Sequence, residues 1–365
     1  MLAATTQYMI LYNFILFLAI VTAMNYIKTA NGFRPESAVA QKEALFLLVF
    51  MIVIIAFRDW RSPLYGDSFV YGRSIALARD GANNLWDDWG FNLLFSTWAK
   101  LGLSPELFFI LTATVYCVPM YLIARRLDMH YTFLILLFFA SSFTFFAFGV
   151  NGIRNGMASS LVMLAMTYKD RKYLMALLLF IGFSLHDSMM LPIAALIITM
   201  LYTKTSFYIR LWIASILVSV FVSGYFQQLF LQLDFVSTSG SGYLGAAVDM
   251  EGVKFARTGY RWDFVMYSGV PVLLGYYITE IKKESNEMYT FLLNTYLLCN
   301  SMWILVIRAN YSNRIAYLSW FIMPIVMVYP IIKFNGFKNK NIAVALILLP
   351  YFLFSYIMWV IKPYY

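Results

Sequence analysis

The sequence predicts an all-α polytopic membrane protein with about 12 transmembrane helices. Of its 365 residues, 62% are hydrophobic and 12% are charged, whereas a soluble domain is only about half apolar. Aromatic residues make up 19% of the chain, and tyrosine and tryptophan are enriched where spans meet lipid headgroups. These observations indicate that most of the chain lies in a lipid bilayer.

Apolar runs follow one another along the chain, and each is predicted to form a helix. Most approach the length of about 20 residues that an α-helix needs to cross a bilayer. The predicted runs are 7–26, 42–57, 105–123, 131–148, 152–168, 173–185, 188–202, 207–224, 263–279, 289–307, 315–332 and 341–361. Residues 1–365 are predicted to form a single transmembrane domain, interrupted by two longer segments, 58–104 and 225–262.

Basic residues assign the loops to the two sides of the membrane. Loops with an excess of lysine and arginine stay in the cytoplasm, and one alternate set of short loops has such an excess. Its basic residues are Lys28, Arg34, Lys42, Arg125, Arg126, Lys169, Arg171, Lys172, Lys204, Arg210, Lys282, Lys283, Lys333, Lys338 and Lys340. The segments 58–104 and 225–262, and both chain ends, are then predicted to lie on the outer side.

Arginine and lysine are unevenly divided between these two sides. The cytoplasmic set is mostly lysine, whereas the outer set is mostly arginine. A planar guanidinium binds phosphate or carboxylate through two parallel hydrogen bonds, which an ammonium group cannot make. The outer arginines are therefore predicted to bind an anionic ligand, with pairing to outer acids or lipid phosphates as the alternative. They are Arg58, Arg61, Arg73, Arg79, Arg154, Arg257, Arg261, Arg308 and Arg314.

The first outer segment, 58–104, combines charge with an amphipathic helix. It opens with Arg58 and Arg61, and Asp67 follows at the predicted start of a short helix. Asp67 is expected either to cap that helix or pair with a cation, or to serve as an acid, a base or a substrate contact. Residues 89–101 place their aromatic and leucine side chains at helical spacing, which predicts a helix lying at the membrane surface.

Two short polar stretches lie at span ends on the same side. Arg154 and Asn155 follow small residues at the start of a span, where free N–H groups suit an anion. A cation in the first turn opposes the helix dipole, so Arg154 is predicted to face an anionic ligand or else lipid phosphate. His186 and Asp187 lie in a turn between spans. A histidine there can accept a proton from a hydroxyl, although the cluster also suits a simple hairpin turn.

The second outer segment, 225–262, contains Arg257, Tyr260 and Arg261 near its end. Aromatic rings beside arginine suit stacking on sugars together with phosphate binding, and they equally suit a rim at headgroup depth. Arg314 and Tyr317 begin another span from the outside.

The same composition argues against several function classes. The basic residues are scattered between apolar runs, so no nucleic-acid partner is predicted. The outer clusters lack the histidine and carboxylate set of a metal site, so neither a metal nor another cofactor is predicted. The spans also lack the chain of carboxylates typical of a proton-driven transporter.

These features resemble the EpsG-like branch of the Wzy-type polysaccharide polymerases over about residues 45–332. The resemblance depends on Arg58, Tyr65, Gly66, Asp67, Ser68, Phe69, Val70, Tyr71, Trp89, Gly90, Phe91, Gly152, Ile153, Arg154, Asn155, His186, Ser188, Arg314 and Tyr317. The Arg-Gln pair usual in that family is Arg154-Asn155 here, and the usual glutamate before the Phe91 helix is absent.

The resemblance implies a glycosyltransferase of the bacterial inner membrane with its active site facing the periplasm. It would join undecaprenyl-pyrophosphate-linked oligosaccharides into an O-antigen or exopolysaccharide by metal-independent, inverting transfer. The arginines would hold the pyrophosphate, and His186 is the expected base, with Asp67 or Asp187 orienting or replacing it. A chain-length regulator and a flippase are expected partners. A lipid-linked oligosaccharide flippase and an outward-facing ligase or acyltransferase are the alternatives.

Overall fold

The computed structural model describes residues 4–29, 32–33, 35, 38–62, 65–78, 88–231, 260–309 and 312–361. These residues form helices joined by short turns, and none of them forms a β-strand. The all-α prediction is therefore confirmed for this part of the chain. The helices group into two compact units, Met1–His186 with Asn339–Pro363, and Asp187–Lys338 with Tyr364–Tyr365.

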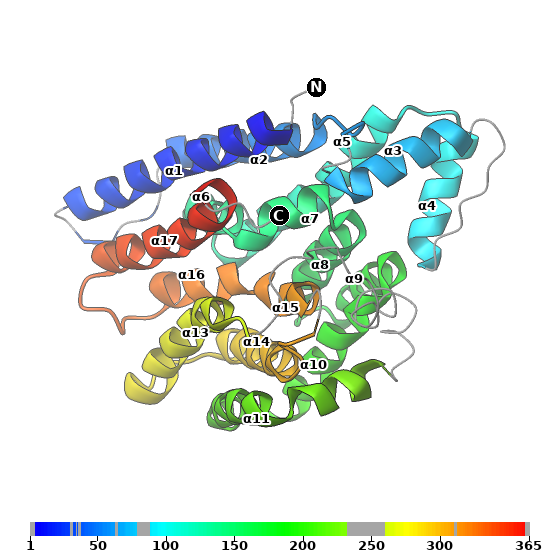
Figure 1. The fold of residues 1–365 in the computed structure, drawn as a ribbon. Helices are drawn as coiled ribbons and strands as arrows, with labels where there is room; N and C mark the ends of the chain where they lie inside the picture. Colours follow the sequence, from blue (N-terminus) through cyan, green and yellow to red (C-terminus); the bar gives the residue numbers. More distant parts are fainter. Residues whose placement is uncertain are drawn as a thin grey trace. The chain divides into compact units, whose positions relative to one another are not determined.

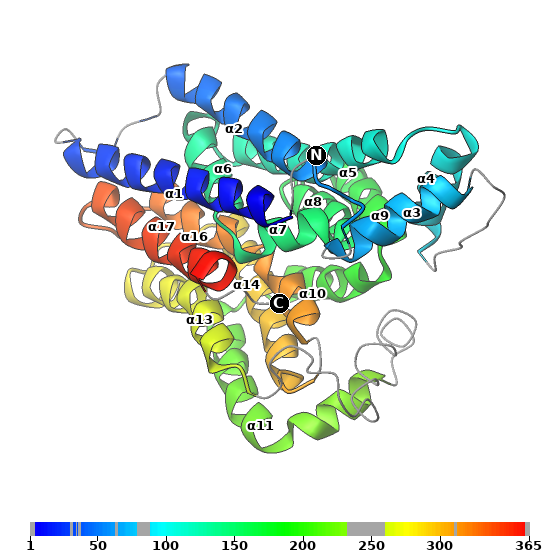
Figure 2. The ribbon, with the colours of Figure 1, turned by 45° about the horizontal axis from the view of Figure 1, so that its top comes forward.

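The first unit combines the N-terminal half of the chain with its last helix. Its helices are α1 (Ala4–Lys28), α2 (Ala38–Ala56), α3 (Asp67–Ala78), α4 (Trp89–Lys100), α5 (Pro105–Leu127), α6 (Thr132–Ala140), α7 (Phe143–Val150), α8 (Ile153–Met166), α9 (Lys172–Leu185) and α17 (Lys340–Tyr356). The last helix, α17, packs along the first, α1 (Figures 1 and 2). Hydrogen bonds from Ser355 to Ser141 and from Trp359 to Phe143 tie the end of the chain to α6 and α7.

The second unit is built around α14 (Glu287–Leu305). Its other helices are α10 (Met190–Leu201), α11 (Thr205–Leu231), α13 (Trp262–Tyr276), α15 (Ser312–Trp320) and α16 (Met323–Lys333). The amide of Asn300, in α14, is buried and paired. Asn300 accepts a hydrogen bond from Trp212 of α11 at 2.8 Å and donates one to Ser319 of α15 at 2.9 Å. Pairing of this kind removes the cost of burying an amide.

The predicted apolar runs coincide with helices, but the predicted number of spans is not confirmed. Six helices of the described residues are long and apolar enough to cross a membrane, or seven if α6 and α7, which are bent by 72°, form one broken span. Helices α8 and α9 have 14 residues each, or about 21 Å, against a hydrocarbon core of about 30 Å. The single-domain organisation stays a prediction.

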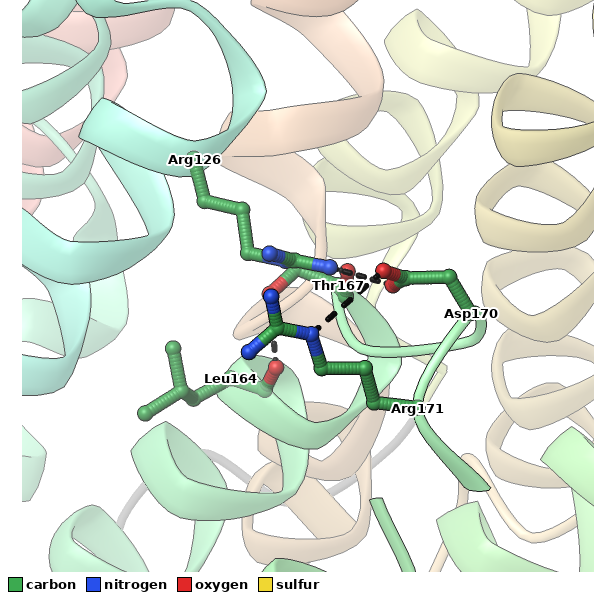
Figure 3. A network of polar contacts seen from close by, with 5 residues as sticks. All are labelled: Arg126, Leu164, Thr167, Asp170 and Arg171. Atoms are coloured by element: carbon green, nitrogen blue, oxygen red, sulfur yellow. Dashed lines mark hydrogen bonds and ion pairs between the residues drawn. The ribbon is translucent and has the colours of Figure 1, made fainter. Parts of the chain in front are cut away.

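A polar network marks one end of the helices in the first unit (Figure 3). Arg126, in the last turn of α5, donates to the Thr167 carbonyl at 2.6 Å and forms an ion pair with Asp170, which also pairs with Arg171. The hydrogen bond from Arg126 lowers the pKa of Asp170 below its usual value. Because α5 and α8 both finish here, the start of α8 and the end of α9 lie at the opposite end.

Candidate functional site

A buried carboxylate, Asp88, lies between a cation and an imidazole at that opposite end. Asp88 directly precedes α4 and is 1% exposed. Its Oδ2 forms an ion pair with Nη1 of Arg154, in the first turn of α8. Its Oδ1 lies 3.6 Å from Nδ1 of His186, the residue that follows α9. Arg154 and His186, from two other helix ends, therefore share the Asp88 carboxylate.

The position of Asp88 depends on close packing between α4 and α9. A Cβ atom added at Gly90 would lie 2.7 Å from the backbone oxygen of Ser184, which is closer than such atoms approach. Only glycine lets the first turn of α4 rest on the last turn of α9. The apolar face of α4, with Phe91 and Phe95, packs on Phe108 of α5. Phe91 and Phe95 thus cover protein, while Leu101 of the same predicted face is exposed. A helix lying at the membrane surface stays a prediction.

Two residues of α3 complete the surroundings of Arg154. Tyr71 hydrogen-bonds to Arg154, and the charge of Asp67 acts on both Arg154 and Tyr71. Burial raises the pKa of Tyr71 well above its usual value, so its hydroxyl stays neutral. The Arg154 guanidinium also lies over the ring of Phe91, 5.8 Å from the centroid. The Arg154 side chain is 23% exposed, so part of it faces solvent.

Arg58 lies near this cluster but is sealed from solvent. It is 1% exposed, donates through Nη1 to the Gly149 carbonyl, and lies over the Phe109 ring, 4.3 Å from the centroid. Among the described residues, its Nε and Nη2 have no hydrogen-bond partner. Burial lowers its pKa to about 9, which still leaves it cationic at neutral pH. Arg58 thus adds a positive charge that interacts with Asp67, but its side chain offers no exposed surface to a ligand.

The glycines around Arg154 have a packing role. A Cβ atom at Gly156 would lie 2.6 Å from the Phe148 carbonyl oxygen, and one at Gly149 would lie 2.1 Å from Cδ1 of Ile55. These glycines let α7 turn tightly into α8 through Asn151 and Gly152. The small residues therefore place Arg154 by allowing close packing of protein on protein.

A family model for the EpsG family matches residues 43–365. The chain belongs to the EpsG family. No curated protein matches it, and neither does any solved structure. Family membership confirms the resemblance found in the sequence and identifies a polysaccharide-polymerase-like membrane protein. The matched range includes Asp88, Arg154 and His186, so the buried cluster belongs to the EpsG-like part of the chain.

Asp88 is the residue that the sequence analysis missed. The glutamate usual before the Phe91 helix is absent from the sequence, and the aspartate at position 88 was not considered. The available signal was the pair Asp87-Asp88 directly before Trp89, at a helix start where acids are favoured. Within the described part of the chain, the Asp88 side chain does not cap α4, because it is engaged by Arg154.

Two other residues of the first unit that the sequence predicted as substrate contacts are Arg61 and Asn155. Arg61 is exposed, lies over the Trp60 ring at 4.5 Å, and has its Nη2 3.8 Å from the Glu106 carboxylate. Asn155 is half-buried next to Arg154. The sequence left open that outer arginines pair with outer acids instead of an anionic ligand, and Arg154 and Arg61 do have acidic neighbours.

The predicted residues of the second unit have local partners. Arg261 forms a two-point ion pair with Asp263 at 2.8 and 2.5 Å, and the Tyr260 hydroxyl lies 2.8 Å from that of Ser219. Tyr317 accepts a hydrogen bond from Asn313, while Arg314 is exposed. Asp187 begins a short 3-10 turn, Asp187–Met189. Arg79 and Arg257 lie outside the described residues.

The cluster combines a group that can bind an anion with a group that can exchange a proton. Among the described residues, no group of three or more histidine, cysteine, aspartate or glutamate side chains is placed to hold a metal ion. Arg154 supplies a permanent cation with an exposed part, and His186 supplies a group that exchanges protons near neutral pH. Asp88 fixes the positions of both.

Proposed function

We propose that this protein is a polysaccharide polymerase that joins undecaprenyl-pyrophosphate-linked oligosaccharide units at the periplasmic face of the inner membrane. The observation that supports this proposal is the shared Asp88 carboxylate, which holds Arg154 and His186 side by side at one end of the first unit. A cation next to a base suits transfer from a pyrophosphate-linked donor, because the cation offsets charge on the leaving group and the base takes the proton of the acceptor.

The reaction breaks one bond and forms one. A hydroxyl of the acceptor sugar attacks the anomeric carbon of the donor from the face opposite the pyrophosphate, so the configuration inverts. The carbon–oxygen bond to pyrophosphate breaks, and its electron pair leaves with the lipid pyrophosphate. Arg154 offsets the negative charge that develops on the leaving group. His186 takes the proton of the attacking hydroxyl at Nε2, because Nδ1 faces Asp88.

The sequence left Asp67 or Asp187 as the residue that orients the base, and the geometry favours Asp88 for this role. The Asp88 carboxylate lies 3.6 Å from the imidazole. Asp67 acts electrostatically on Arg154 and Tyr71, which places it with the cation. We therefore assign Asp67 the role of positioning Arg154 and Tyr71, which form the donor site.

The periplasmic side is supported by the charge of the two helix ends. Arg126 lies at one end of these helices, and Lys169, Arg171 and Lys172 lie close together at the same end, between α8 and α9. Such a concentration of basic residues is typical of cytoplasmic loops. The Asp88 cluster lies at the other end of the same helices. A flippase would need its cations near the middle of the membrane, so this placement favours a polymerase.

The test is to purify the full-length protein and give it lipid-linked repeat units in detergent. A polymerase forms a ladder of longer glycans without any membrane compartment, which a flippase cannot do. His186→Gln, which keeps a hydrogen-bonding side chain but cannot take up the proton, is expected to leave only single units.

His130→Gln is the matched control, because His130 is the other histidine of the chain and is exposed beside the opposite helix end. It is expected to form a normal ladder. A full ladder from His186→Gln would exclude the proposed base, and no ladder from the wild-type protein would exclude the polymerase.

A further inference from the structure

Asp88 is engaged on both sides, and its two partners differ in accessibility. Oδ2 faces Arg154 and Oδ1 faces His186. The Asp88 side chain is 1% exposed and that of His186 is 9% exposed, whereas that of Arg154 is 23% exposed. An anion arriving from solvent therefore reaches the arginine first, while the carboxylate stays buried behind it.

The two partners also compete for the charge of Asp88. A carboxylate that neutralises a guanidinium in contact with it has less effect on a second group at 3.6 Å. A bound phosphate would share the guanidinium, since arginine offers several donors in one plane. The Asp88 charge would then be less compensated, and its attraction for a protonated imidazole would rise.

We infer that Asp88 couples donor binding to activation of the base: when a donor phosphate binds Arg154, the Asp88 carboxylate acts more strongly on His186 and makes the imidazole a better proton acceptor. Asp88 is thus a positioning residue that acts through its two partners. This inference rests on the proposed function, because it takes Arg154 as the donor site. The base is then strongest only when a donor is present, which favours binding of the donor before attack by the acceptor.

The neighbouring groups support this direction of coupling. Among the described residues, the charged and titratable groups with contacts to Asp88 are Arg154 from α8, His186 after α9, and Tyr71 from α3. Asp67 of α3 acts on Arg154 and Tyr71, and Asp187 directly follows His186 in the chain. Tyr71 stays neutral, since burial raises its pKa. Arg154 is therefore the cation that sets how much of the Asp88 charge reaches His186.

The test measures the titration of His186 directly, without any reaction. The chain has two histidines, so isotope-labelled histidine in the full-length protein gives one signal from the site and one from His130 as an internal reference. Inorganic pyrophosphate is the probe for the anion. In the wild-type protein, it is expected to raise the titration midpoint of His186 by about one pH unit, with His130 unchanged.

Two variants separate coupling through Asp88 from a direct effect of the anion. In Asp88→Asn, only the direct attraction between pyrophosphate and the imidazole remains, so the upward shift should shrink markedly. In Arg154→Gln, the cation that competes for Asp88 is absent. The midpoint should then be raised already without pyrophosphate and should no longer respond to it. This second variant keeps the test decisive if Asp88→Asn does not fold.

Equal pyrophosphate-induced shifts in the wild-type protein and Asp88→Asn would overturn the inference. So would an unchanged His186 midpoint in the wild-type protein, whether or not pyrophosphate binds, and a lowered midpoint in Arg154→Gln. The glycan ladder is measured separately. A polymerase that makes a normal ladder but shows no coupled titration would lose this inference and keep its proposed function.

Discussion

Replacing Gly90 with alanine tests whether the contact between α4 and α9 positions the site. The added Cβ atom would lie 2.3 Å from Oγ of Ser184 and 2.7 Å from its backbone oxygen. The hydroxyl can rotate away, but the carbonyl belongs to α9 and cannot. An ordinary contact begins at 3.4 Å, so the start of α4 must retreat by about 0.7 Å. The distance from Asp88 to His186, now 3.6 Å, would grow by a similar amount.

The expected effect on activity is larger than the effect on stability. Overpacking destabilises the folded protein by about 1–3 kcal/mol, and the higher helix propensity of alanine offsets about 1 kcal/mol of this loss. The protein should therefore remain in the membrane at a reduced but measurable level. A displacement of about 1 Å in a catalytic group lowers rates by about 100-fold. We expect Gly90→Ala to slow polymerisation by roughly 10- to 100-fold per molecule.

The assay is the rate of ladder formation by purified protein, normalised to the amount of folded protein. Gly269→Ala is the matched control, because Gly269 is also in a helix, α13, but an added Cβ atom there meets its nearest neighbour, Trp212, at 3.5 Å. It gains the same helix propensity without a clash and should polymerise normally. A normal rate from Gly90→Ala would show that close docking of α4 on α9 is not needed to place Asp88.

Three further predictions concern the cation, its phenol neighbour and the orientation. Arg154→Lys should slow polymerisation about 10- to 150-fold, because it loses a charge-assisted hydrogen bond. The control Arg126→Lys should polymerise normally and only melt at a lower temperature. Equal rates in both variants would argue against an arginine clamp. Tyr71→Phe removes the hydroxyl that bonds Arg154 and should cost about 1.5 kcal/mol, roughly 10-fold in rate; an unchanged rate would make the phenol dispensable. Lys100→Cys should react with a membrane-impermeant thiol reagent in spheroplasts, whereas Tyr173→Cys, at a site 95% exposed, should not. Background labelling should be low, because Cys117 and Cys299 are buried. The reverse labelling pattern would invert the topology.

The sequence by itself determined where the helices lie and which family the chain resembles. Long apolar runs have few other ways to satisfy their backbone in a membrane than to form helices, so the runs and the helices coincide. Arg154 and His186 could be found because Arg154 begins a span directly after small residues and His186 is one of two histidines in the chain. The order of these motifs along the chain was enough to indicate the EpsG-like branch.

Only the tertiary structure decided which of these residues meet. Asp88 lies 66 positions before Arg154, and nothing local in its sequence distinguishes an exposed helix-starting acid from a buried one. Its burial depends on Gly90 allowing α4 to rest on α9. The same holds for Arg58, which the sequence grouped with accessible arginines but which packing against Phe109 and Gly149 seals from solvent. Contacts between distant segments depend on how side chains fill space together, and a linear pattern does not contain that information.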